Sequence, residues 1–538
     1  MGSVKLLDCT LRDGAYITNS EFGEYAIKGI IDKLQKAGTD IIECGWLKNS
    51  PHKAGTSFYH VPRDLEQYLT NKNGRLTYTV MIDWDRYDLS LLPPCDGKSV
   101  DAVRVVFPCG KYREGVEVGL KIKEKGYKIY FQAANTMDYS DGELAELAEA
   151  VNMAKPVGLS IVDTFGAMYP EDLKRITEIL HKHTDKDISL GFHSHNNQQL
   201  SFALTMDFVN MLRESGRDII IDSSLCGMGR GAGNTPTELA VSFLNRKCGC
   251  SYDMDAVMDA IDIYMEYFKE NYSWGYSTPY FIAGMYGCHV NNIAYLLDNH
   301  RTKAKDMRNI IGSLEPADRR KYDYDLLEKK YFENQSFYAE DSEAVKILAE
   351  EFSGREIFIS APGKSSLDER EKVLSYISEH GSVVIGVNAI LDGYDYDYVF
   401  FTNAARYEYA KNAKGEAFGK FRKILLSTVK SVPDKGEIII SFNKVVKRGW
   451  KHFDNAAVCC FRMLDMLGVK KAAVAGFDGF KTKYNESYAD PFLPTLNPDN
   501  KWEELNEEIK EIFADFRRHA VNCKDITFVT ESIFDILS

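Results

Sequence analysis

Two short stretches of the chain carry residue types that could hold a metal ion. In LLDCTLRDGAY, near the N-terminus, an apolar run is followed by Arg12 and Asp13. In SLGFHSHNN, another apolar run ends in His193 and His195. Alternate residues of a strand point to the same face, so we expect both imidazoles to face one point. One carboxylate and two imidazoles with open positions make a site for a divalent metal in the range from Mg and Mn to Zn.

The first stretch also has a plainer interpretation, because an Arg–Asp pair before a glycine is typical of a solvated turn with a weak ion pair. The histidine stretch favours the metal site instead. We expect Gly14 to let the chain turn sharply, so that Arg12 and Asp13 lie at the carboxyl end of a strand. In a βα barrel, that end carries the chemistry.

The elements that must position these residues alternate along the chain, with short apolar or β-branched runs between longer amphipathic stretches. Eight predicted strands begin at Lys5, Asp40, Tyr78, Ala102, Lys128, Leu159, Ile188 and Asp218. The predicted helices between them include residues 24–37, 115–125, 141–154, 170–183 and 200–215. Eight such units in about 235 residues have the number and size of a TIM (β/α)8 barrel.

A chain of 538 residues is too long for one hydrophobic core, so we expect several domains. Residues 1–250 are predicted to form the barrel, 251–352 a helical extension that packs on it, and 353–538 a second, Rossmann-like α/β domain. Six strands are predicted in this last domain, starting near residues 356, 382, 396, 436, 471 and 525. The loop SAPGKSSLDER after the first of them is similar to a phosphate-handling turn, but it lacks both Gly-x-Gly-x-x-Gly and the Walker spacing.

Composition excludes several classes of partner. The net charge of -13 argues against a nucleic acid or an anionic membrane as partner. No apolar run approaches the roughly 20 residues that span a bilayer, and the N-terminus lacks the apolar region of a signal peptide. The 11 cysteines contain no Cys-x-x-Cys pair and fit reduced thiols. We therefore expect a cytoplasmic protein.

Five motifs occur in order, each at the end of a predicted strand: TLRDG, IECGW, VDTFGAMYPED, GFHSHNN and GRGAGNTPTE. Over residues 4–300 the chain resembles the metal-dependent aldolase and lyase superfamily that includes 4-hydroxy-2-oxovalerate aldolase, 3-hydroxy-3-methylglutaryl-CoA lyase and the isopropylmalate synthases. The motifs VDTFGAMYPED, GAGNTPTE and AGMYG bring it nearest to the aldolase branch.

The resemblance implies a metal site formed by Asp13, His193 and His195. In the lyase relatives the asparagine of the glycine-rich loop also reaches the metal, and here it matches Asn234, whose alternative role is to brace the loop. The expected ion is Mn2+ or Mg2+, with Zn2+ or Co2+ as alternatives.

The resemblance also assigns groups to a 2-oxoacid substrate. Arg12 is expected to hold the enolate oxygen, where charge develops. Glu43 and Thr164 match substrate-side positions in a supporting role. Tyr286, in AGMYG, matches a tyrosine that assists proton transfer, although it could instead cap the barrel.

The chain departs from the aldolase branch at the general base. The third residue after the metal-binding aspartate is a histidine in that branch, and here it is Tyr16. A tyrosine of ordinary pKa, near 10, is a poor base at neutral pH. Three alternatives stay open: Tyr16 is tuned, another group such as His289 or Tyr286 takes over, or the acceptor aldehyde differs from the usual one.

The resemblance therefore predicts an aldolase that forms or cleaves a 4-hydroxy-2-oxoacid from pyruvate and a short aldehyde. One alternative is a lyase or Claisen-type synthase acting on an acyl-CoA, and another is a nucleotide-binding scaffold with an inactive barrel. The aldolases of this branch usually work with an aldehyde dehydrogenase, and such barrels are commonly homodimers.

The last domain contains SAPGKSSL, GVNAI, DYVFFTN and DNAAVCCFRMLDMLGVKKAAVAGFDGF. It resembles the Rossmann-like domain of archaeal-type hydroxymethylpterin pyrophosphokinases, motility-associated factors and some sialyltransferases. This resemblance implies a bound nucleotide or nucleotide-sugar. A fused domain of this kind would suit a pathway that makes a surface-glycan building block.

Overall fold

A computed structural model describes residues 2–535, except 70, 301, 336–338, 430–432, 482–483 and 496–500. The chain forms two compact units. One contains Met1–Ile293 and Ile311–Tyr322, and the other contains Ala294–Ile310 and Asp323–Ser538. The chain therefore passes from one unit to the other three times.

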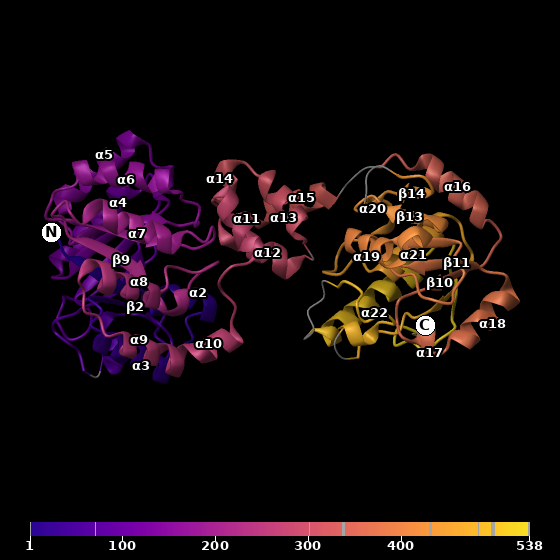
Figure 1. Cartoon of the computed structure of the whole chain (residues 1–538), viewed down its shortest axis with the longest axis horizontal. Coiled ribbons are helices and arrows are strands. Elements are labelled where there is room, and N and C mark those ends of the chain that lie inside the picture. The colour runs from indigo at the N-terminus through magenta and orange to yellow at the C-terminus, as the bar shows by residue number, and fades with distance from the viewer. Residues whose placement is uncertain are drawn as a thin grey trace. The chain divides into compact units, whose positions relative to one another are not determined.

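The first unit is built on a closed parallel barrel (Figure 1). Its eight strands are β1 (Val4–Asp8), β2 (Ile41–Leu47), β4 (Thr77–Asp83), β5 (Ala102–Phe107), β6 (Lys128–Ala133), β7 (Gly158–Asp163), β8 (Ser189–Ser194) and β9 (Ile219–Ser223). They pair in chain order, and β1 closes the ring by pairing with both β9 and β2. A short strand, β3 (Phe58–Tyr59), pairs with β2 outside this ring. The predicted TIM barrel is confirmed.

Local sequence signals explain the helices that alternate with these strands. They are α3 (Glu24–Ala37), α4 (Tyr112–Glu124), α5 (Asp141–Ala154), α6 (Pro170–His183), α7 (Ser201–Leu212) and α8 (Thr237–Phe243). Helix α5 begins with a capping box, in which the Ser140 hydroxyl accepts from the Glu143 backbone N–H. Helix α6 begins with a proline at its first position, and Gly38, with φ +78°, ends α3.

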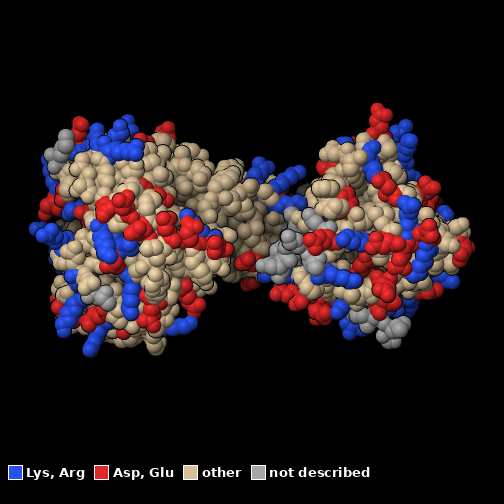
Figure 2. Space-filling model, turned by 60° about the horizontal axis from the view of Figure 1, so that its bottom comes forward, with Lys and Arg blue, Asp and Glu red and all other residues tan. Residues whose placement is uncertain are grey.

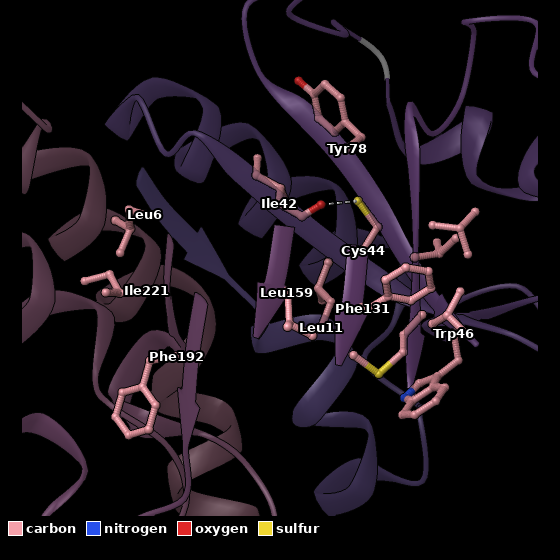
Figure 3. Packing of buried hydrophobic residues seen from close by; sticks show 14 of the residues in the cluster. Leu6, Leu11, Ile42, Cys44, Trp46, Tyr78, Phe131, Leu159, Phe192 and Ile221 are labelled. Atoms are coloured by element: carbon pink, nitrogen blue, oxygen red, sulfur yellow. Dashed lines mark hydrogen bonds between the residues drawn. The ribbon is translucent and has the colours of Figure 1, made fainter. Parts of the chain in front are cut away.

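A dense cluster of aliphatic and aromatic side chains packs between the barrel strands and the helices around them (Figure 3). Leu6, Ile42, Phe131, Leu159 and Phe192 come from five different strands and are all buried. Burial of such a side chain contributes about 1.5–3 kcal/mol. Strands buried on both faces read as continuous apolar runs, which is why the sequence located them.

Helices follow the barrel, as the sequence predicts for residues 251–352. They are α9 (Met254–Ala260), α10 (Glu266–Asn271), α11 (Thr278–Tyr286), α12 (Val290–Asn299), α13 (Ala304–Gly312), α14 (Pro316–Arg319), α15 (Tyr324–Gln335) and α16 (Ser342–Phe352). Helices α9 to α11 and α14 lie in the first unit, whereas α15 and α16 lie in the second. The helical segment therefore contributes to both units.

The second unit contains a parallel seven-stranded sheet in the order β14-β13-β12-β11-β10-β15-β16. The strands are β10 (Ile357–Ser360), β11 (Val383–Val387), β12 (Tyr398–Phe401), β13 (Arg422–Leu426), β14 (Glu437–Ile440), β15 (Lys471–Ala475) and β16 (Asp525–Phe528). Its helices are α17 (Ser365–Asp368), α18 (Arg370–His380), α19 (Ala404–Lys414), α20 (Phe442–Val445), α21 (Ala456–Met466) and α22 (Trp502–His519). The predicted second α/β domain is confirmed, with β13 in addition to the six expected strands.

Acidic and basic side chains are interspersed on the face of the molecule shown in Figure 2. In the described part of the chain, no helix combines the length and the apolar character that a membrane crossing requires.

Candidate metal centre and active site

A short helix, α1 (Thr10–Asp13), follows β1 and carries Arg12 and Asp13 at the carboxyl end of the barrel strand. The sharp turn expected at Gly14 is wrong, because this residue has an ordinary φ of -62°. Glycine is needed there for space instead. A Cβ at this position would lie 2.5 Å from the Thr10 carbonyl oxygen and 2.8 Å from Met228 Sδ.

Asp13, His193 and His195 lie together, with one ligand atom of each within 4.8 Å of the other two. Asp13 Oδ2 is 3.7 Å from His193 Nε2 and 4.0 Å from His195 Nε2. Ligand atoms that share one ion at about 2.0–2.2 Å lie roughly 3–4 Å apart. The three side chains therefore have the spacing of a metal-binding set.

Asn234 joins this group from the glycine-rich loop, which pairs with His195 through an isolated β-bridge. Its Nδ2 donates to Asp13 Oδ2 at 2.5 Å, while its buried Oδ1 has no hydrogen-bond partner among the described residues. A Cβ at Gly229 would lie 2.4 Å from Asn234 Nδ2 and 3.0 Å from Asp13 Oδ2. A buried carbonyl oxygen without a donor fits a cation at this point.

A chain of buried ion pairs fixes Arg12 beside the metal-binding set. Arg12 donates through Nη1 to Asp13 at 2.8 Å and through Nε to Glu43 at 2.7 Å. Glu43 also accepts from Arg104 Nη1 at 2.8 Å, and Arg104 Nη2 donates to Asp222 at 2.5 Å. Buried charges are stable only when they are paired in this way.

This chain of ion pairs ends on a proposed ligand. Asp222 Oδ2 lies 3.0 Å from His193 Nδ1. Burial favours protonation of Asp222, but Arg104 and His193 hold its pKa below the usual value, so it is charged and accepts the Nδ1 proton. The lone pair of His193 is then on Nε2, the atom that faces Asp13.

The charge states suit a cation. Although burial opposes it, Arg12, His195 and His193 hold the pKa of Asp13 well below its usual range. Burial lowers the pKa of His195 to about 3, so its imidazole is neutral at pH 7. Metal ligands must be deprotonated, and these two are.

Arg230, a residue that the sequence analysis missed, lies between two candidates for proton transfer. Its guanidinium carbon is 3.7 Å from the centre of the Tyr16 ring, and its Nη1 is 3.3 Å from His289 Nε2. Tyr16 is 43% exposed as a whole, and local desolvation still raises the pKa of its hydroxyl despite the attraction of Arg230. Burial lowers the pKa of His289 to about 3. At pH 7 the tyrosine is therefore a neutral donor and the histidine a neutral imidazole.

The remaining predicted site residues, Glu43, Thr164 and Tyr286, each make a contact of their own within the protein. Glu43 belongs to the ion-pair chain and is fully buried. Thr164 follows β7, and its Oγ1 accepts from the Asn135 backbone N–H at 2.8 Å. Tyr286, at the end of α11, packs against Arg319, whose guanidinium carbon is 4.9 Å from the ring centre. The substrate and proton-transfer roles of these residues stay predictions.

A parallel (β/α)8 barrel with an Asp-His-His set at the carboxyl ends of its strands defines the class of this unit. Residues 112–263 match the HMGL-like family. This match covers part of the barrel, and together with relatives named 4-hydroxy-2-oxovalerate aldolase it bears out the resemblance drawn from the five motifs. The resemblance of the second unit to nucleotide-binding families stays a prediction.

Individual relatives are distant. The chain is 28% identical over 267 residues to an oxaloacetate decarboxylase of Mycobacterium tuberculosis. This alignment covers 47% of this chain and 74% of the relative. It is 28% identical over 271 residues to a 4-hydroxy-2-oxovalerate aldolase of Thermomicrobium roseum, and this alignment covers 48% of this chain and 71% of the relative. The HMG-CoA lyase structure from Brucella melitensis aligns with a TM-score of 0.39 at 15% identity, covering 50% of this chain and 100% of that one. The named relatives and the family support a lyase.

Proposed function

We propose that the barrel is a divalent-metal-dependent lyase that forms or cleaves a 4-hydroxy-2-oxoacid from pyruvate and a short aldehyde. The observation that carries this proposal is the convergence of Asp13, His193 and His195 beside the fixed guanidinium of Arg12. Asn234 completes the proposed ligand set. Mn2+ or Mg2+ is the proposed ion, with Zn2+ or Co2+ as alternatives. A cation bound there would supply Lewis-acid stabilisation of the enolate charge.

Arg12 contributes a second positive charge at the same place. Its Nε and Nη1 are held by Glu43 and Asp13, so the guanidinium cannot reorient during the reaction. A donor that is fixed before charge develops stabilises a transition state more than one that must move. Glu43 and Thr164 are proposed to support substrate binding, Glu43 through its hold on Arg12.

We propose Tyr16, which stacks on Arg230, as the group that transfers a proton to and from the 4-hydroxyl group of the substrate. Tyr16 stays protonated at neutral pH, so it suits donation to an alkoxide in the direction of synthesis. Cleavage needs the reverse step, in which a group with a raised pKa is a poor base. His289, on the other side of Arg230, and Tyr286 are the alternative groups.

A second candidate function follows from the poor suitability of Tyr16 as a base. Decarboxylation of oxaloacetate leaves the same pyruvate enolate but needs no base for a hydroxyl proton. The tyrosine at position 16, in place of the histidine of the aldolase branch, favours this reaction, and one relative is named an oxaloacetate decarboxylase. The acyl-CoA lyase and synthase alternatives have no comparable support. The presence of Arg12, Asp13, His193 and His195 argues against an inactive barrel.

The first experiment is deuterium exchange into the methyl group of pyruvate, followed by NMR on chelator-stripped protein with and without Mn2+ or Mg2+. We expect exchange that requires the metal and is lost in Asp13→Asn. Absence of exchange with every metal would contradict enolate formation from free pyruvate. Parallel assays with oxaloacetate and 4-hydroxy-2-oxovalerate then decide between decarboxylase and aldolase.

The wider setting is also part of the proposal. Homologous aldolases usually work with an aldehyde dehydrogenase and form dimers, so we propose a homodimer and such a partner. A cytoplasmic location is proposed from the sequence features given above, and a role in making surface-glycan precursors from the resemblance of the last domain to families that bind nucleotides or nucleotide-sugars.

A further inference from the structure

The second unit contains a cavity of about 220 Å³, far larger than the ~30 Å³ share of one water molecule. It lies beyond the carboxyl ends of the strands in the middle of the sheet. Its lining includes Gly363 after β10, Asn388 after β11, Asn403 after β12 and Gly476 after β15. The strand order reverses between β10 and β15, and parallel sheets bind ligands at such a switch point.

Two glycines shape the floor of the cavity, because the loops after β10 and β15 touch there. A Cβ at Gly363 would lie 2.4 Å from the Gly476 carbonyl oxygen and 2.5 Å from Asp478 Oδ2. Gly476 has φ +73°, a conformation that favours glycine. The two glycines therefore let the loops after β10 and β15 pack closely together beside the cavity.

Two helices of eleven residues each point their N-termini at the cavity. Asn403 caps α19 by accepting from the Arg406 backbone N–H at 2.9 Å, and Asn455 caps α21 by accepting from Val458 at 3.2 Å. The first residues of both helices line the cavity. Free N–H groups and the helix dipole favour an anion at such a point, although a helix terminus alone defines no site.

Arg406 supplies an independent observation. Its side chain lines the cavity, is only 5% exposed, and has an Nη1 without a hydrogen-bond partner among the described residues. It forms no ion pair within 4.0 Å with any acidic residue in the described ranges. The nearby Asp490 accepts from the Tyr409 hydroxyl at 2.7 Å instead. The guanidinium carbon lies 4.7 Å from the centre of the Tyr488 ring, a contact that leaves its charge uncompensated. A buried guanidinium stays charged, so it calls for an anion from outside the chain.

The other charged groups in the cavity limit the chemical class of ligand that fits. Asp306, Asp454 and Asp478 line the same cavity, as does Lys303. Carboxylates accept hydrogen bonds from hydroxyl groups but repel a bare anion. The combination suits a molecule that carries one anionic group and several hydroxyl groups, rather than an inorganic ion.

We propose that this cavity binds the phosphate ester of a sugar or nucleoside. The phosphate contacts Arg406 and the N-termini of α19 and α21, and the hydroxyl-bearing part faces Asp478. Phosphate esters of both kinds share this chemistry, and the proposal is independent of the reaction assigned to the barrel.

Calorimetric titration of the full chain tests the proposal with ribose 5-phosphate, AMP, adenosine and inorganic phosphate. We expect ribose 5-phosphate or AMP to bind at least about tenfold more tightly than adenosine and inorganic phosphate. Binding of both esters identifies the shared sugar phosphate, and binding of AMP alone identifies a nucleotide. If neither ester binds, the proposal is wrong.

Hydrogen exchange locates the bound ester without any variant. We expect protection of backbone amides at the first turns of α19 and α21 and in the loop after β15. Protection confined to the barrel would overturn the proposal.

Arg406→Met is expected to weaken binding of the ester at least about tenfold, because it removes the positive charge that faces the cavity. The variant also loses the contact of the guanidinium with the Tyr488 ring, so its melting temperature is measured alongside binding. Arg462→Met is the matched control. Arg462 lies in the same unit, with a side chain 11% exposed, but it is 3.9 Å from Asp515 and outside the cavity lining, so its variant should keep ester binding. Unchanged ester binding by Arg406→Met would contradict the proposal.

Discussion

The Nδ1 atom of His193 lies 3.0 Å from Oδ2 of Asp222, the same oxygen that accepts from Arg104 at 2.5 Å. One carboxylate thus orients a proposed metal ligand and anchors the buried ion pairs that reach Arg12. Because carboxylates in this position fix the tautomer and the basicity of a histidine ligand, the relationship can be tested through metal affinity.

Asp222→Asn keeps the shape of the side chain but removes its charge. We expect the affinity for Mn2+, measured by titration with electron paramagnetic resonance, to fall about 10–100-fold. Asp8→Asn is the control, because Asp8 is also a buried carboxylate at a strand end but accepts from Thr237 and Thr10. Equal losses in both variants would mean that the effect comes from the fold alone.

Gly229→Ala tests the space beside the proposed ligands. The new Cβ would lie 2.4 Å from Asn234 Nδ2 and 3.0 Å from Asp13 Oδ2, so these side chains must shift. We expect metal binding to weaken at least about tenfold while the far-ultraviolet circular dichroism spectrum is kept. Gly142→Ala, in α5, meets no atom within 4 Å and should bind metal normally with unchanged or raised stability. Normal metal binding by Gly229→Ala would place the ion elsewhere.

Arg12→Lys keeps the charge but loses the fork that contacts Glu43 and Asp13 together. We expect the metal-dependent rate of pyruvate deuterium exchange to fall about 100-fold, with metal affinity changed by less than about threefold. An unchanged exchange rate would remove Arg12 from enolate stabilisation. Lys28→Arg, on the exposed side of α3, provides a variant of the same type away from the site.

Tyr16→Phe separates the two candidate functions. Only the aldol reaction transfers a proton at the 4-hydroxyl oxygen. Because the group that donates this proton in synthesis also removes it in cleavage, we expect both directions of the reaction with 4-hydroxy-2-oxovalerate to slow about 100-fold. Oxaloacetate decarboxylation should stay within about threefold of the unmodified protein. If aldol cleavage is unaffected, His289 or Tyr286 becomes the candidate, and the same assay on His289→Gln distinguishes them.

Asp163 predicts a pH dependence of stability. It is fully buried, accepts from the backbone N–H groups of Ala167 and Met168, and burial raises its pKa to about 7. The folded state therefore holds a proton that the unfolded state releases near pH 4, so its stabilising effect is lost as pH rises from about 4 through 7. We expect the melting temperature to fall between pH 5 and 8, and to fall less in Asp163→Asn. If the melting temperature depends on pH equally in the two proteins, the raised pKa of Asp163 is refuted.

The sequence predicted the metal-binding set because its members follow apolar runs. His193 and His195 end one buried strand and Asp13 follows another, and parallel strands bring their carboxyl ends to one rim. Arg104 and Asp222 could not be assigned in the same way. Each is a single charge in an apolar strand, where alternation predicts only the face on which it lies. The partners of Arg104 are 61 and 118 positions away, and those of Asp222 are 118 and 29 positions away. A lone arginine within AVRVVF was the signal that could have been followed.

The fold shows the same division between local and distant information. The predicted ends of α3 and α6 agree with the structure because capping and apolar periodicity are local. Strand β13 was missed because RKILL begins with two basic residues, and its burial depends on neighbours on both sides. The role of Gly14 was wrong for a related reason, since the atoms that exclude a side chain come partly from Met228.

The closing of β1 onto β9 has a consequence for how the protein is made. Asp13 and Asn234, which are hydrogen-bonded, stand 221 positions apart in the chain. A growing polypeptide acquires Asp13 early but cannot assemble the ligand set until the last strand and the glycine-rich loop have been synthesised. Such distant pairing is slow to form. Assembly of the proposed ligand set is therefore a late event, which comes only when the ring is complete.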